Sequence, residues 1–281
     1  RLLPRSRLSR ALGRVAQAPA PRVLLDRAIE LYVRAYDVDL SECVRPEGGY
    51  RSFDDFFGRA LREGARPIEG DATTLVCPAD GRIEELGPID ARSRMIVKGH
   101  EYGVGELTGD ERDARLFEGG TFAVVYLSPR DYHRVHAPVD GEVVLVRHVP
   151  GTLYPVNRIG TEHVPHLFAK NERVAVTQSS AAFGPVITIL VGAIGVGSVS
   201  LAFEPRVRSN TGTQSGTLRY ERDRPFLARG AEIGAFHLGS TAIVLVPPSP
   251  AARRDVLAAC AGDPARVGQR LLRRVPEARP A

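Results

Sequence analysis

A stretch of twenty residues without a single charge, from Gly184 to Phe203, constrains the fold of this chain more than any other feature. Its length would suffice for a transmembrane helix. However, Gly192, Gly195 and Gly197 interrupt a run of valines and isoleucines, and this mixture is typical of strands and turns. We therefore expect two buried strands separated by a turn, and no membrane span.

Other β-branched runs follow from about residue 70 onward. They are TFAVVYLSP (121–129), GEVVLVRHV (141–149) and RVAVTQ (173–178). Two segments also echo one another, because CPADGRIEEL (77–86) and APVDGEVVLV (137–146) share Pro-x-Asp-Gly ahead of an apolar run. Asp-Gly is a strong signal for a tight turn. The pattern predicts a mainly β protein in which a strand begins after each of these turns.

The first 35 residues carry the basic charge of the chain. They hold eight arginines against Asp26 and Glu30, a net charge of +6, whereas the whole chain has a formal net charge of +5. Apolar residues recur at helical spacing here, so we expect two basic amphipathic helices. These helices could lie on an anionic surface, either lipid headgroups or nucleic acid, or pack on the body with a solvated arginine face. The Arg- and Ser-rich start also resembles an organellar transit peptide.

Metal-binding and disulfide patterns are weak in this sequence. The three cysteines are far apart and form no CxxC pair, so they indicate neither a zinc site nor a disulfide framework. His133 and His136 are three residues apart, and on a strand such positions point to opposite faces. We therefore predict no metal site.

The segment FHLGSTAIVLV (236–246) places Gly239 and Ser240 at the mouth of an apolar strand. A β-bulge or bend is one explanation. A nucleophile is another, since Ser240, His136 and Asp80 are the residue types of a nucleophile, its base and an orienting carboxylate. All three fall at expected strand ends or turns, where sites gather. Each residue alone is more often structural, so both explanations remain open on the residues themselves.

A resemblance to a known family rests on an ordered set of motifs. They are FDDFFGRALREGARPI (53–68), KGHEYGVGELTG (98–109), TFAVVYLSPRDYHRVHAP (121–138), GTLYPVN (151–157), LFAKNERV (167–174), FGPVITILVGAIGVGS (183–198) and LGST (238–241). In this order they resemble the membrane-type bacterial phosphatidylserine decarboxylases, from about residue 50 to residue 246. The C-terminal part is similar only at VGQRL (267–271).

The resemblance implies an α+β, mainly β fold with two facing antiparallel sheets around the active site. Residues 1–45 would form a helical membrane-association segment and residues 46–281 a catalytic domain. Self-cleavage between Gly239 and Ser240 would yield a β chain (1–239) and an α chain (240–281) that remain associated, and Ser240 would become a pyruvoyl cofactor.

By motif match, Ser240 would be the nucleophile of this cleavage, His136 its base and Asp80 the orienting carboxylate. The resemblance implies that the mature enzyme decarboxylates phosphatidylserine to phosphatidylethanolamine and CO₂ through a Schiff base on the pyruvoyl ketone, with His133 in acid–base work. The implied partner is an anionic phospholipid membrane, bound peripherally at the cytoplasmic face of the inner membrane. We expect no nucleic-acid partner and allow for a homodimer.

Other functions are compatible with parts of this pattern. A pyruvoyl decarboxylase could act on another amino-acid substrate, because the LGST chemistry does not name the substrate. Paired Pro-x-Asp-Gly turns near a histidine also resemble lysostaphin-like zinc peptidases, although no HxxxD pair stands out. A biotinyl- or lipoyl-like carrier would present a lysine at a hairpin tip, and neither Lys98 nor Lys170 lies in such a motif.

Overall fold

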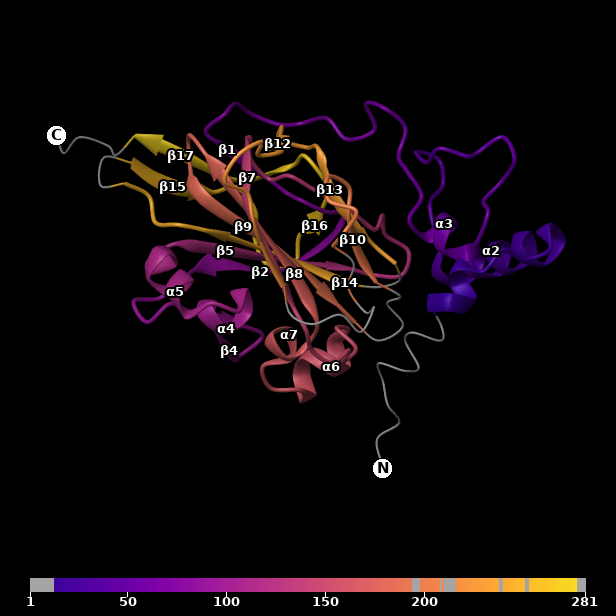
Figure 1. Ribbon diagram of the computed structural model, residues 1–281, viewed down its shortest axis with the longest axis horizontal. Helices are drawn as coiled ribbons and strands as arrows, with labels where there is room; N and C mark the ends of the chain where they lie inside the picture. The colour runs from indigo at the N-terminus through magenta and orange to yellow at the C-terminus, as the bar shows by residue number, and fades with distance from the viewer. Residues whose placement is uncertain are drawn as a thin grey trace.

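In the part of the chain that the structure describes, a nine-stranded antiparallel sheet forms the centre of the fold (Figure 1). This computed structural model describes residues 13–193, 198–207, 209, 216–237, 240–250 and 253–276. The strands run in the order β11 (Gly216–Arg219), β7 (Gly141–Val149), β8 (Arg173–Ser180), β9 (Gly184–Gly192), β14 (Ser240–Val246), β5 (Thr121–Leu127), β2 (Gly81–Pro88) and β16 (Pro264–Ala265), and β12 (Phe226–Leu227) also pairs with β7.

The central strands of this sheet are buried on both faces. Along β14, Ala242 and Val244 pack into one hydrophobic core, whereas Ile243 and Leu245 pack into a second core on the opposite face. A strand covered on both sides needs a continuous apolar run rather than an alternation. This burial accounts for the uncharged stretch, whose first nine residues form β9 beside β14. No helix among the described residues is long and apolar enough to cross a membrane.

The uncharged stretch contains two strands, as expected, but they lie in different sheets. After β9 the chain forms β10 (Val199–Leu201), which pairs with β13 (Glu232–Phe236), and β13 pairs with β6 (Arg134–His136). Residues 194–197, where we expected a turn, lie outside the described residues. The smaller sheet contributes side chains to the same core as one face of the large sheet. The predicted mainly β, α+β fold with antiparallel sheets is confirmed.

Short helices cover the second face of the large sheet (Figure 1). Arg173 on β8 is buried and donates hydrogen bonds to the carbonyl oxygens of Glu106, Leu107 and Ala169. These carbonyls lie near the ends of two helices, where backbone acceptors lack helical partners. Burial lowers the pKa of Arg173 to about 10. The elements on this face are β3 (Arg94–Val97), β4 (His100–Gly103), α4 (Val104–Thr108), α5 (Glu111–Phe117), α6 (Arg158–His163) and α7 (Leu167–Lys170).

The two Pro-x-Asp-Gly echoes each lead into a strand that begins at the glycine, as predicted. These strands are β2 and β7. Gly81 has a φ of 151° and lies so close to Tyr126 O that a Cβ would clash with it. A Cβ on Gly141 would come within 2.6 Å of Ser179 O. Glycine is therefore required at both positions by the close approach of the neighbouring strand.

Within the described residues, backbone pairing joins the segments before and after residue 240 in several places. Strand β14 pairs with β5 and β9, and β16 pairs with β2. Strand β17 (Arg270–Pro276) lies between β15 (Arg253–Leu257) and β1 (Thr74–Val76) in a three-stranded sheet. The C-terminal residues, which matched the resemblance poorly, thus complete the β structure at its edges.

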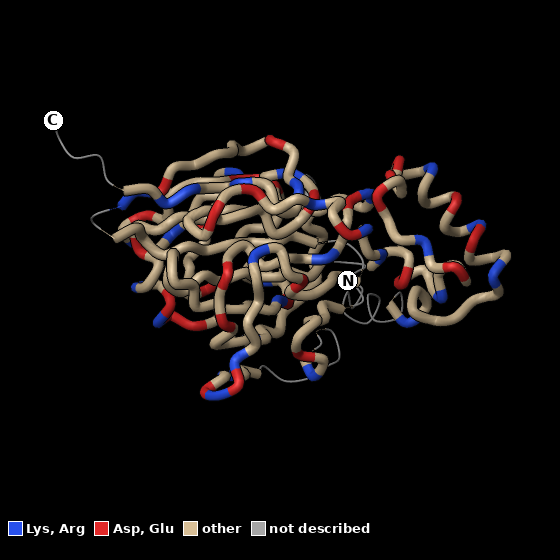
Figure 2. Tube along the Cα trace, turned by 90° about the horizontal axis from the view of Figure 1, so that it is seen from above, with Lys and Arg blue, Asp and Glu red and all other residues tan. Residues whose placement is uncertain are grey.

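Helices α2 (Arg22–Tyr36) and α3 (Phe53–Phe57) project from one side of the β body (Figure 1). One face of α2 packs against α3 through Leu25, Ile29 and Phe56. Positive and negative residues intersperse along this projection (Figure 2). The helix thus has a packed face and a second apolar face that is exposed. That exposed face includes Val23, Leu24 and Leu31.

Candidate active site

Ser240 is the first residue of β14, in the middle of the large sheet. It pairs with Leu127 on β5 and with Gly192 on β9. The residue is completely buried, and its Oγ has no hydrogen-bond partner among the described residues. Buried hydroxyl groups are almost always hydrogen-bonded. An unbonded hydroxyl at the mouth of a central strand is therefore a candidate reactive group. Gly239, the predicted partner in cleavage, lies outside the described residues.

Asp80 lies just before β2, at the same end of the large sheet as Ser240. Gly81 packs against the Tyr126–Leu127 backbone, and Leu127 pairs with Ser240. Because neighbouring strands are about 4.8 Å apart, the backbones of Gly81 and Ser240 lie roughly 10 Å apart. Asp80 and Ser240 therefore come from strand ends that the sheet places close together.

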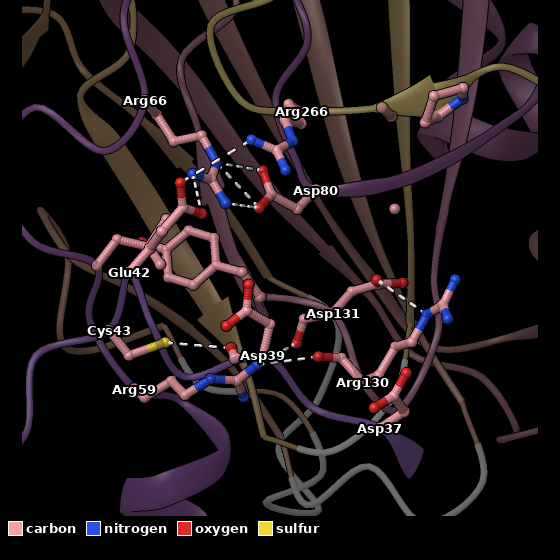
Figure 3. Close-up of a pocket in the computed structure, with 15 residues that line it drawn as sticks. Asp37, Asp39, Glu42, Cys43, Arg59, Arg66, Asp80, Arg130, Asp131 and Arg266 are labelled. Carbon is pink, nitrogen blue, oxygen red and sulfur yellow. Dashed lines mark hydrogen bonds and ion pairs between the residues drawn. The ribbon is translucent and has the colours of Figure 1, made fainter. Parts of the chain in front are cut away.

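The carboxylate of Asp80 is engaged by Arg66. Arg66 Nε donates to both carboxylate oxygens at 3.0 Å, and Arg66 Nη2 donates to Oδ2 at 2.5 Å. Val267 N also donates to Asp80 Oδ1 at 2.8 Å. Figure 3 shows the guanidinium of Arg66 between Asp80 and Glu42. Both carboxylate oxygens of Asp80 thus accept hydrogen bonds from N–H donors in the described structure.

His136 lies at the end of β6, and both of its ring nitrogens are hydrogen-bonded. Its Nδ1 is 2.7 Å from Gly230 O, and its Nε2 is 3.0 Å from Tyr132 Oη. A carbonyl can only accept, so Nδ1 carries the proton and Nε2 accepts from the Tyr132 hydroxyl. Burial lowers the pKa of His136, while Gly230 O, Glu232 and the charge of Asp80 oppose this effect. The histidine is therefore a neutral base with Nε2 as its basic atom.

His133 is completely buried and has one free ring nitrogen within the described structure. Its Nδ1 donates to Asp131 O at 2.8 Å, whereas Nε2 has no partner among the described residues. Its ring lies 4.0 Å, centroid to centroid, from the ring of Phe57 on α3. Burial lowers its pKa to about 3. At neutral pH the imidazole therefore presents an unprotonated Nε2.

Within the described residues, no two members of the predicted triad share a direct hydrogen bond. Among the described residues, Asp80 and His136 share no hydrogen bond, although His136 N donates to Pro78 O at 2.7 Å and so lies beside the segment that leads to Asp80. Ser240 Oγ likewise contacts neither histidine through a hydrogen bond within that part of the chain. The four predicted residues occupy neighbouring strand ends, and their roles remain predictions.

A cavity of about 330 Å³ opens beside Asp80 (Figure 3). It carries both signs of charge, from arginines and carboxylates on five segments of the chain. The charged residues that line it are Asp37, Asp39, Glu42, Arg59, Arg66, Asp80, Arg130, Asp131 and Arg266. Tyr132, the hydrogen-bond partner of His136, also lines it. The cavity therefore connects the Arg66–Asp80 ion pair to the Tyr132–His136 hydrogen bond.

Comparison with known proteins identifies the family. The family model described as phosphatidylserine decarboxylase matches residues 53–273. The chain belongs to the phosphatidylserine decarboxylase family. A phosphatidylserine decarboxylase proenzyme of Bordetella avium is 46% identical over 250 residues, covering 88% of this chain and 84% of the relative. One of Shewanella putrefaciens is 42% identical over 249 residues, covering 87% and 86%.

Membership in this family confirms the resemblance and the assignment to an enzyme class, the decarboxylases. The matched region contains all four predicted site residues and the two helices α4 and α5. Within the described part of the chain, no three His, Cys, Asp or Glu side chains are placed to share a metal ion. The family assignment separates this chain from the zinc peptidases considered as an alternative.

Two residues of the site were missed by sequence reasoning. Both residues lie inside motifs on which the resemblance rests. Arg66 lies in FDDFFGRALREGARPI (53–68), and Tyr132 lies in TFAVVYLSPRDYHRVHAP (121–138). An arginine or a tyrosine in such a motif gives no sign of its partner, and the partner of Arg66 is 14 residues away. Their roles depend on contacts made by the fold.

Proposed function

We propose that the chain cuts itself between residues 239 and 240, that Ser240 becomes a pyruvoyl group, and that the mature protein decarboxylates phosphatidylserine. The observation that carries this proposal is the completely buried Ser240 Oγ, which has no hydrogen-bond partner among the described residues. Such a hydroxyl is free to attack the preceding carbonyl. The term proenzyme in the names of the relatives agrees with a chain that is processed.

The cut proceeds by an acyl shift followed by an elimination. Ser240 Oγ attacks the carbonyl carbon of residue 239, the C–N bond breaks, and the peptide becomes an ester with a free amine on residue 240. Loss of the Ser240 Cα proton and breakage of the Cβ–O bond release the carboxylate of residue 239. One water then replaces the nitrogen, which leaves as ammonia, and a ketone remains at the start of the α chain.

The base in the acyl shift is His136, and a hydroxyl requires such a base to become a nucleophile. Gly230 O holds the Nδ1 proton, so the basic lone pair is on Nε2. In the described structure this lone pair accepts from Tyr132 Oη, which must be displaced before Ser240 can transfer its proton. Asp80 supports the base through its negative charge, which raises the pKa of His136 against the effect of burial.

A ketone at position 240 would lie at the start of β14, where Ser240 is completely buried. When present, the pyruvoyl group supplies a carbonyl that binds the substrate amine and accepts the electron pair left behind by departing CO₂. His133 is the residue that handles the proton which returns to the substrate carbon. Its unprotonated Nε2 has no partner among the described residues, and its Nδ1–H is held by Asp131 O. Residue 240 and His133 are both buried, and this burial excludes bulk water from the proton transfer.

The cavity beside Asp80 is where the substrate headgroup binds. Phosphoserine carries a phosphate, an ammonium and a carboxylate, so a cavity with both signs of charge matches it. Arg130 and Arg266 are the exposed cations that bind the phosphate. Their side chains are 63% and 66% exposed, and the ion pairs that they make to Asp131 and Glu42 are long, at 3.9 Å.

The exposed apolar face of α2 holds the enzyme on the membrane as a peripheral protein at the cytoplasmic face of the inner membrane. Leu24 and Leu31 are 65% and 67% exposed, one heptad apart on the helix. Arg27 and Arg34 lie on the same helix. Apolar insertion combined with arginines that attract anionic lipids is the usual design of an interfacial helix.

Intact-mass measurement of the purified protein tests the self-cleavage. We expect two chains, 1–239 and 240–281, the smaller one lighter by one ammonia than a peptide that starts with serine. Ser240→Ala is expected to give one uncut chain. A wild-type chain that stays uncut and inactive would refute the proposal. Release of CO₂ from phosphatidylserine vesicles, compared with release from free amino acids, distinguishes the lipid from another amino-acid substrate.

A further inference from the structure

His237 lies at the end of β13, three residues before Ser240, and forms a hydrogen-bonded chain with two other segments. Its Nδ1 is 2.8 and 3.0 Å from the two carboxylate oxygens of Asp54 on α3. Its Nε2 is 2.9 Å from Ser200 Oγ on β10. The backbone is held as well, because His237 N donates to Ser198 O at 2.9 Å. Three segments distant in sequence thus meet at this residue.

The direction of the hydrogen bonds follows from the chemistry of the groups. An ionised carboxylate only accepts, so His237 Nδ1 carries a proton and donates it to Asp54. In the neutral imidazole Nε2 is then an acceptor, and the Ser200 hydroxyl donates to it. Asp54 and His237 have side chains that are 13% and 22% exposed. Partial burial strengthens such a charge-assisted bond relative to one at the surface.

Two charged residues next to the Asp54–His237–Ser200 hydrogen bonds are already paired with one another. A cavity of about 520 Å³ contains Asp54, Ser200 and His237 in its lining, together with Arg134 and Glu232. Arg134 and Glu232 form an ion pair at 2.8 Å. The carboxylate of Asp54 is therefore available to His237.

Helix α3 also contacts His133, a second residue of the predicted site. The ring of Phe57 packs on His133, and His133 O accepts a hydrogen bond from Phe236 N at 2.9 Å. Asp54, one turn earlier on the same helix, holds His237. The helix thus contacts both the buried histidine and the strand that leads into the scissile bond.

We propose that the Asp54–His237–Ser200 chain is a positioning device for self-cleavage, and that it makes the cut depend on a docked helix α3. This inference rests on the self-cleavage proposed above. Ser240 is fixed by its strand partners, so the approach of the residue-239 carbonyl depends on how the preceding segment is held. A misplacement of about 1 Å between reacting atoms can slow a reaction by about 100-fold.

The order of carboxylate, imidazole and hydroxyl is also that of a serine hydrolase. Positioning is favoured because His237 is three residues from the proposed nucleophile and because its backbone is held to Ser198. Hydrolysis of a p-nitrophenyl ester that is lost in Ser200→Ala would instead assign a catalytic role to this chain and overturn the proposal.

The test follows the appearance of the two fragments after a pulse of cell-free synthesis of the full chain. We expect His237→Ala and Asp54→Ala to slow the cut by about tenfold or more. Asp54→Asn and Ser200→Thr should cut near the wild-type rate, because an amide oxygen and a second hydroxyl can make the same bonds. His166→Ala is the control, since His166 has a comparable contact with Glu106 at the surface.

The outcomes separate this inference from the function on which it rests. If wild type does not cut, both fail. If wild type cuts and His237→Ala cuts equally fast, only the positioning role is wrong. Equal slowing in Asp54→Asn and Asp54→Ala would also refute it, because the hydrogen bond would then not be the feature that matters. Once cleaved, the variants should show KM and kcat within about twofold of wild type, whereas a general loss of structure would change both.

Discussion

Arg66 holds Asp80 through two nitrogen atoms of one guanidinium group, with Nε at 3.0 Å and Nη2 at 2.5 Å from the carboxylate. Both side chains are only 11% exposed. The pair orients the carboxylate whose charge acts on His136. The Asp80 side chain is therefore set by a residue outside the predicted triad.

Arg66→Ala should slow self-cleavage and lower the free energy of unfolding by about 3 kcal/mol, because it leaves Asp80 with an unpaired charge in a largely buried site. Arg66→Lys should recover only part of the loss, since lysine cannot make the two-nitrogen contact. Urea unfolding of the Ser240→Ala background measures the stability without interference from the cut. An unchanged unfolding free energy would show that Arg66 does not support Asp80.

The two neighbouring histidines should separate the two reactions. We expect His136→Ala to slow the cut by about 100-fold or more, the usual contribution of a general base. His133→Gln should still give both fragments but lose decarboxylation by a similar factor. Fragment analysis and CO₂ release on the same preparations check both statements. A His133→Gln protein that remains uncut, with an unfolding transition like that of wild type, would reverse the assignment.

The buried His133 should make stability depend on pH. Burial lowers its folded-state pKa to about 3, whereas the unfolded value is about 6.5. Between these values the unfolded state binds the extra proton, so the free energy of unfolding falls as pH falls below about 6.5, by up to about 1.4 kcal/mol per pH unit. Above pH 6.5 His133 is neutral in both states, so it no longer lowers the free energy of unfolding.

Urea unfolding at pH 7.5 and pH 5.0 measures this loss in the uncut Ser240→Ala background. Adding His133→Gln should reduce the difference between the two pH values. His136 contributes in the same direction, because burial lowers its pKa as well, so some dependence should remain. Equal differences with and without His133 would show that the imidazole is not buried in its neutral form.

Arg130 and Arg266 at the rim of the cavity should affect substrate binding rather than maturation. Each replaced by alanine should raise KM for phosphatidylserine several-fold, because a cation for the phosphate is lost. The cut should proceed at the wild-type rate, since neither residue is hydrogen-bonded to His136 or Ser240 in the described part of the chain. Kinetics in mixed micelles, corrected for the cleaved fraction, check this. A fall in kcat with KM unchanged would contradict the headgroup assignment.

The outer face of α2 should be needed for membrane binding and dispensable for maturation. Leu24→Asp combined with Leu31→Asp should reduce sedimentation with anionic vesicles by at least about tenfold, because two apolar side chains no longer insert. Leu116→Asp on α5 is a matched control, since Leu116 is also exposed, at 53%. Both proteins should be cut normally. Equal sedimentation of the two variants would locate the membrane contact elsewhere.

Local signals in the sequence predicted much of the β structure. The Asp-Gly turns predicted the starts of β2 and β7. Only glycine fits at these two positions, because a Cβ would clash with the backbone of the neighbouring strand. The uncharged stretch from Gly184 to Phe203 predicted two buried strands. It could not reveal that β9 and β10 separate into different sheets, because strand partners are chosen by packing across the whole chain. The sequence likewise could not predict which face of α2 is packed. In the structure the packed face is the one that contacts Phe56.

The sequence by itself determined the family, the β character and the identity of the candidate reactive residues, since these depend on ordered motifs and on local turn and strand chemistry. Tertiary structure alone decided how those residues are held. Asp80 is paired with Arg66, His136 with Tyr132, and His237 with an aspartate 183 residues away. The reason is physical: hydrogen bonds and burial depend on which side chains the fold brings within about 3 Å, and spacing along the chain does not encode that distance.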